Sequence, residues 1–165
     1  MSARILAAIA LAALVLAPAQ ISRSQTSTSA FACPVTLPPQ PAFTPTGVTP
    51  LAERRGFYFG TPELSLLLTR PWYQHMNKIP WFSDAIRYPD PVDLKVTSRR
   101  LDGDAPPAEF KGLNVARTLD LAGKPAYDFL TASMKFPTAG CWEITAQMNE
   151  TKLTFVTDVQ RGEQR

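Results

Sequence analysis

The stretch FPTAGCWEITAQMNETKLTFVTDV, residues 136–159, has the clearest periodic pattern in the chain. From Trp142 to Met148 apolar and polar residues alternate, so that positions 142, 144, 146 and 148 share one face. Asn149-Glu150 is a turn signal, and Leu153, Phe155 and Val159 then continue an apolar face. The pattern predicts an antiparallel hairpin that belongs to an all-β fold.

The same alternation assigns opposite faces to two neighbours, Cys141 and Trp142. A period of two that turns Trp142 into the core turns Cys141 outward. An outward cysteine can reach a segment that crosses the outside of the sheet. The segment that contains Cys33 is the candidate, because the chain has only two cysteines.

The first residues, MSARILAAIALAALVLAPAQ, have a basic residue, a short apolar run and small residues at Ala17 and Ala19. This order is typical of a secretory signal peptide at residues 1–19, cleaved after Ala19. Ala30-Phe31-Ala32 is an alternative cleavage site, and a lipidated Cys33 is a further, weaker alternative. We expect a secreted or periplasmic protein without a transmembrane segment after the signal is removed.

An exported chain meets an oxidising compartment, which favours a disulfide between Cys33 and Cys141. Two separate buried thiols are the alternative. A closed metal site would need further ligands beyond these cysteines and the single histidine, His75. The net charge of +3 is small and scattered, so the sequence predicts no nucleic-acid partner.

The rest of the chain divides into an arm, residues 20–55, and a β-sandwich domain, residues 56–160. The arm is rich in Ser and Thr and then in proline, which favours an extended surface segment over a central strand. FYFG after Gly56 predicts a strand, and TPELSLLLT predicts either a helix or, as we prefer, a strand. RPWYQHMNKIPWFSDAIRYPDP is interpreted as a long connection broken by prolines.

VDLKVTSRRL alternates as a half-buried strand does, DGDAPP ends it with turn residues, and AYDFLTASMKF predicts a further strand. The stretch between them, which contains Gly112 and Gly123, is assigned no element.

Two resemblances follow from these blocks. GCWEITA followed by LTFVTDV looks like the last two strands of immunoglobulin-like bacterial extracellular modules. FPTAGCWEITA, LKVTSRRLDGDAPP and CPVT together resemble a family of uncharacterised exported bacterial proteins. The resemblance covers about a third of the chain, and it implies export and an immunoglobulin-like antiparallel β-sandwich with a proline-rich N-terminal arm, but no reaction.

No phosphate-binding loop, nucleophile elbow or zinc-protease motif is present in the sequence. A catalytic or metal site centred on His75 would lack an evident thiol partner, because Cys141 is assigned to the disulfide. Asp102-Gly103-Asp104 is interpreted as a turn rather than a calcium site, and Asn149-Glu150-Thr151 fits both a turn and a glycosylation acceptor. We therefore expect no enzyme activity and no cofactor.

An aromatic cluster lies between the predicted strands: Trp72, Tyr73, Trp81, Phe82 and Tyr88. Exposed, these rings would form a binding surface for a glycan or a protein. Buried, which we prefer, they would close one end of the core. The leading hypothesis is a non-catalytic exported module that acts through surface contacts. The alternatives are an enzyme or metal-handling protein centred on His75 and a peptidase-inhibitor-like sandwich that presents loops.

Overall fold

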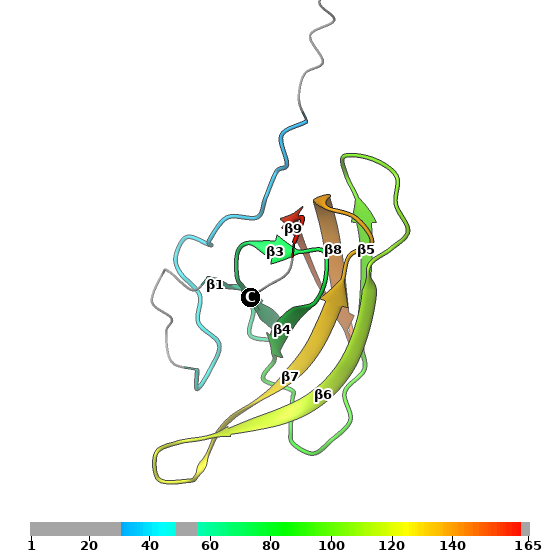
Figure 1. Ribbon diagram of the computed structural model, residues 1–165. Coiled ribbons are helices and arrows are strands. Elements are labelled where there is room, and N and C mark those ends of the chain that lie inside the picture. Colours follow the sequence, from blue (N-terminus) through cyan, green and yellow to red (C-terminus); the bar gives the residue numbers. More distant parts are fainter. Residues whose placement is uncertain (1–30, 49–55, 163–165) are drawn as a thin grey trace, which may run out of the picture. The chain divides into compact units, whose positions relative to one another are not determined.

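Nine strands make up most of the part of the chain that the structure describes. The computed structural model describes residues 31–48 and 56–162, and no helix occurs in these ranges. The strands are β1 Phe57–Thr61, β2 Leu64–Leu68, β3 Trp72–Tyr73, β4 Asn77–Phe82, β5 Leu94–Arg100, β6 Glu109–Leu119, β7 Pro125–Lys135, β8 Gly140–Met148 and β9 Thr151–Gln160 (Figure 1). The predicted signal peptide, residues 1–19, lies outside the described residues, as do arm residues 20–30 and 49–55.

The strands form two sheets. One has five strands in the order β1-β2-β4-β7-β6, and the other has four in the order β3-β9-β8-β5. All pairings are antiparallel except the short parallel pairing of β3 with β9. The two sheets share one core, so the fold is all-β and resembles a β-sandwich, as the sequence predicts.

The predicted closing hairpin is confirmed. β8 and β9 pair without interruption from Gly140 opposite Val159 to Met148 opposite Thr151. Asn149 has a φ of 53°, a left-handed conformation that Asn tolerates in a tight turn. Trp142, Ile144, Ala146 and Met148 are all buried, and Trp142 has no exposed surface. The face assignment from the alternation is therefore correct.

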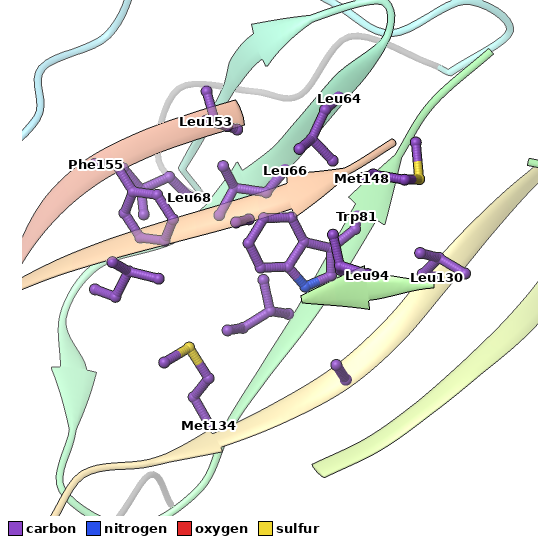
Figure 2. Close-up of a cluster of buried hydrophobic side chains, with 14 of the residues drawn as sticks. Leu64, Leu66, Leu68, Trp81, Leu94, Leu130, Met134, Met148, Leu153 and Phe155 are labelled. Carbon is purple, nitrogen blue, oxygen red and sulfur yellow. The ribbon is translucent and has the colours of Figure 1, made fainter. Parts of the chain in front are cut away.

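The core lies between the sheets and is filled by large side chains from both. Figure 2 shows Trp81 of β4 among leucines of β2, with Leu153 and Phe155 of the opposite sheet beside them. The rings of Trp81 and Phe155 are 6.3 Å apart. Aromatic and leucine side chains bury the largest areas per residue, so this cluster provides most of the hydrophobic stabilisation.

Two interpretations of the sequence are wrong. The supposed connection after Leu68 contains β3 and β4, and β4 lies between β2 and β7 inside the five-stranded sheet. The stretch around Gly112, which was assigned no element, is part of β6. Pro80 lies inside β4, opposite Thr131 of β7, while the pairing of β4 with β2 covers only Trp81 and Phe82.

The predicted disulfide is confirmed: Cys33 and Cys141 are bonded, with Cα atoms 5.4 Å apart. The described part of the arm follows the surface of the domain. The backbone N–H of Thr36 donates to the carbonyl of Val156 on β9, and the N–H of Val156 donates back to Thr36 Oγ1. Farther along, Phe43 forms an isolated bridge with Tyr58 of β1. These contacts place the arm across two strands that belong to different sheets.

The sequence blocks that carry the family resemblance meet at the start of β8. Arg100 Nε donates to Asp102 Oδ1 at 2.7 Å, and this hydrogen bond, with the backbone N–H of Cys141, lowers the pKa of Asp102. Gly140 has a φ of 137°, and a Cβ there would lie 2.8 Å from the Arg100 and Asp102 side chains. A glycine is therefore required directly before Cys141. Cys141 in turn forms the disulfide with Cys33, the first residue of the CPVT block.

Candidate functional site: a polar cavity beside the β6–β7 ribbon

An open cavity of about 470 Å³ lies where three separate segments meet. One wall is the turn of the arm, another is the loop that follows β4, and the third is the end of the β6–β7 hairpin. The hairpin is a two-stranded ribbon here, because β4 pairs with β7 only from Leu130 onward (Figure 1). We call it the Arg117 cavity, and its lining residues are Thr46, Gly47, Ser83, Asp84, Ile86, Arg87, Arg117, Pro125, Ala126, Tyr127 and Asp128.

Arg117 and Asp128 form the best-organised ion pair of this region. They stand opposite each other in the register of β6 and β7. Arg117 Nε lies 2.6 Å from Asp128 Oδ1, and Nη2 lies 2.9 Å from Oδ2, which is a bidentate geometry. The Asp128 side chain is only 11% exposed, so water competes weakly for it.

Tyr88 completes this ion pair from the loop after β4. Its backbone N–H donates to Asp128 Oδ2 at 3.0 Å, and its carbonyl accepts from Arg117 Nη2 at 3.4 Å. The Arg117 guanidinium lies over the Tyr88 ring, with its central carbon 5.3 Å from the ring centroid. Tyr88 as a residue remains 48% exposed and is therefore accessible to a partner.

These bonds hold the pKa of Asp128 far below its ordinary value of 3.8, at about 2. The hydrogen bond from Arg117 is the largest cause, and the N–H of Tyr88 adds to it. The carboxylate is therefore ionised at every physiological pH, and it cannot act as a general acid or base near neutrality.

The loop between Ser83 and Arg87 is fixed by its own hydrogen bonds. Arg87 Nη1 donates to the carbonyls of Asp84 and Ile86, at 2.6 and 2.7 Å. The N–H of Ala85 donates to Ser83 Oγ, and Ile86 is buried and anchors the loop to the core. The Asp84 side chain is exposed. The loop thus presents a carboxylate and a guanidinium on a pre-formed backbone.

The arm supplies the remaining wall. The N–H of Val48 donates to the carbonyl of Pro45, which closes a turn with Thr46 and Gly47 at its tip. Gly47 has a φ of 77°, and a Cβ there would lie 3.3 Å from the carbonyl oxygen of Ala126. The turn therefore packs closely on β7, and only glycine fits this approach without strain.

The structure separates the members of the predicted aromatic surface. Trp72, Trp81 and Phe82 are buried. For these three rings the preferred interpretation, burial in the core, agrees with the structure. Trp72, for example, packs on Phe136 and Phe155. Tyr73 is half-buried and Tyr88 is exposed. A shared platform of five rings does not form, and a binding role stays a prediction for Tyr88.

The other residues singled out in the sequence lie away from the cavity lining. His75 is exposed in the loop between β3 and β4. Asp102 is engaged by Arg100, and Asn149 forms the exposed turn of the closing hairpin. Within residues 31–48 and 56–162, no three His, Cys, Asp or Glu side chains are grouped so that they could hold a metal ion. The same ranges contain no apolar helix of membrane-spanning length.

Sequence reasoning missed the Arg117–Asp128 pair. Neither residue belongs to a motif, and they become neighbours only through the register of a hairpin whose first strand was not recognised. The alternation in NVARTL and in YDFL was the available signal.

The ion pair gives a pH dependence that can be measured. Because folding lowers the pKa of Asp128, its contribution to stability is complete above about pH 4 and is lost as the pH falls toward about 2. The Asp128→Asn protein should therefore lose less stability than the parent across this range in urea unfolding. Asp93→Asn, which removes a largely exposed partner of Lys95, is the control and should follow the parent. If the stability of the parent and of Asp128→Asn fell equally with pH, the lowered pKa of Asp128 would not be the cause of the loss.

No protein-family model and no curated protein matches the sequence. One solved structure, "X-ray Crystal Structure of a Putative Lipoprotein from Bacillus anthracis", aligns with 74% of this chain and 100% of its own, at 14% identity and a TM-score of 0.35. A likeness of this degree says nothing about what the chain does.

Proposed function

We propose that this protein is an exported, non-catalytic, immunoglobulin-like β-sandwich module that acts through surface contacts with a glycan or a protein, in the cell envelope or outside. Export is supported by the signal-like first 19 residues and by the Cys33–Cys141 disulfide, a bond typical of oxidising compartments. A sulfur engaged in that bond cannot also carry a thioether-linked lipid, which favours a protein that is not anchored through Cys33.

The immunoglobulin-like assignment is supported by the strand order. Immunoglobulin sandwiches have sheets in the orders ABED and CFG. If β2 is strand A and β4 strand B, the chain continues with β5 to β9 as C to G, and the sheets become β2-β4-β7-β6 and β5-β8-β9. The disulfide differs from that of antibody domains, because it joins the arm to strand F instead of joining strands B and F.

The observation that carries the binding role is the Arg117 cavity itself. It is pre-formed, its volume falls within the roughly 300–1,000 Å³ of ligand sites, and its polar groups come from three segments distant in sequence. Its charged residues are suited to recognition, because Arg117 and Asp128 are held by each other and by Tyr88. A binding module needs such fixed donors and acceptors, whereas a hydrolase needs a group that changes its protonation state.

Photo-crosslinking in the producing cells tests this function. A diazirine amino acid at position 88, beside the cavity, is expected to label one envelope or extracellular component. The same amino acid at position 152, an exposed site on β9, is the control and should not label it. Fractionation of the same cells should place the labelled protein outside the cytoplasm. Equal labelling from both positions, or none from position 88, would rule out the proposed contact site.

A further inference from the structure

We infer that the Arg117 cavity binds a short stretch of an uncharged glycan, an inference that rests on the binding function proposed above. The charges of the lining balance, since two arginines, Arg87 and Arg117, stand with two aspartates, Asp84 and Asp128. A site for an anion needs an excess of positive charge. Here Arg117 is paired with Asp128, and Arg87 donates to two backbone carbonyls beside the Asp84 carboxylate, so the lining as a whole has no excess positive charge to offer an anion.

The remaining polar groups match a ligand that has many hydroxyls. Thr46, Ser83 and Tyr127 are the lining residues that carry a hydroxyl, a group that can both donate and accept a hydrogen bond, although Ser83 Oγ already accepts from the N–H of Ala85. The exposed Asp84 carboxylate accepts two hydrogen bonds side by side, a geometry that suits two adjacent sugar hydroxyls. Among the described residues no group is seen to bond this carboxylate, so it is available to a ligand.

Apolar and aromatic surfaces lie next to these polar groups, as recognition of a sugar ring requires, because such a ring has C–H faces as well as hydroxyl edges. Pro125 and Ala126, both exposed, provide apolar contact area. Tyr127 is held in place by ring contacts with Phe82 and Phe129, at 6.1 and 5.8 Å. Tyr88, an exposed residue, packs its ring against the guanidinium of the lining residue Arg117.

The rigidity of the walls favours this ligand class further. The loop from Ser83 to Arg87 is fixed by internal hydrogen bonds, and the arm turn at Gly47 is packed on Ala126. Free sugars bind weakly because water competes for every hydroxyl, so a site gains affinity mainly when its groups are already in place. Asp84 and Thr46, from two different walls, are the side chains that we expect to determine specificity.

Nuclear magnetic resonance titration of the ¹⁵N-labelled, disulfide-bonded protein tests the inference. The probes are neutral di- and trisaccharides of glucose, galactose, mannose and N-acetylglucosamine. The matched charged probes are oligogalacturonate, glycine and inorganic phosphate. At least one neutral saccharide should shift the amide signals of Gly47, Asp84 and Ala126 in a saturable manner, while the charged probes leave them in place.

Variants then show whether the binding groups are those described. Asp84→Asn should lower the affinity for the neutral saccharide about tenfold, which corresponds to the loss of one hydrogen bond to a charged acceptor. Thr46→Val should also weaken binding, whereas Thr154→Val on the outer face of β9 is the control and should bind as the parent does.

The outcomes separate the ligand class from the function. Binding of oligogalacturonate, glycine or phosphate in place of neutral sugars overturns the inference but keeps a binding role for the cavity. If no neutral saccharide shifts these signals while position 88 crosslinks to a protein, the inference fails and the proposed function stands. If position 88 labels nothing and no neutral saccharide shifts these signals, both the inference and the proposed function fail. Saccharide-induced shifts that are confined to residues outside the cavity also overturn the inference.

Discussion

Replacing Trp142 by alanine is expected to lower the free energy of unfolding by about 3–5 kcal/mol, the usual cost of deleting a buried Trp. The indole is fully buried, lies 5.2 Å from the Phe136 ring and donates from Nε1 to the carbonyl of Thr138. Its removal leaves a large cavity and an unpaired carbonyl. The whole free energy of unfolding of a domain is only about 5–15 kcal/mol. The variant should therefore unfold at a much lower urea concentration or temperature than the parent.

Gln147→Ala is the control for this prediction. Gln147 lies on the same strand but on the outer face, where it is partly exposed. Its replacement should change stability by less than about 0.5 kcal/mol. If the two variants unfold at the same denaturant concentration, the assignment of the faces of β8 is wrong.

Removing the disulfide with Cys33→Ser and Cys141→Ser together should cost about 2–5 kcal/mol. The bond joins residues 108 positions apart, and closing a long loop in the unfolded chain accounts for most of this effect in the chain-entropy model. The loss of stability should differ between the arm and the core. The described arm has few backbone bonds to the sheets, at Thr36 and Phe43, so it should detach before the core unfolds.

Hydrogen exchange followed by mass spectrometry can separate these effects. In the double variant, peptides from residues 31–48 should exchange faster at a denaturant concentration that leaves the β8–β9 peptides protected. A variant in which arm and hairpin lose protection together would contradict the independent release of the arm. Stability equal to that of the parent would contradict the larger claim that the disulfide stabilises the fold.

The sequence predicted strands at β1, β2, β5, β7, β8 and β9, from short aromatic or apolar runs and from alternation. The alternation is strict from Trp142 to Met148 of β8 and from Leu130 to Met134 of β7, and the disulfide was predicted from the two cysteines of an exported chain, with Cys141 and Trp142 on opposite faces. β4 was missed because Pro80 is normally a sign of an edge strand or a loop, and here it lies inside a strand between two others. β6 was missed because of an irregularity in its pairing between Lys111 and Asn114, which includes Gly112 and breaks the period of two.

The cavity could be predicted only in part, for a related reason. Tyr88 was singled out as an aromatic residue in a region rich in prolines, and its ring lies beside Arg117 of the cavity lining. Arg117, Asp128 and Thr46 could not be assigned to one place, because their proximity depends on strand register and on the path of the arm. Such tertiary relationships leave no local pattern in the sequence.

The path of the arm along β9 has a consequence for the behaviour of the protein at high concentration. β9 pairs with β8 on one side, and on its other side Thr36 bonds to Val156 while β3 pairs with Val159 and Gln160. An uncovered strand edge is a template for pairing with another chain and hence for aggregation. The arm and β3 together close part of this edge, and the disulfide keeps the arm there. The proline-rich segment therefore protects solubility, and reducing conditions should make the protein prone to self-association before they unfold it.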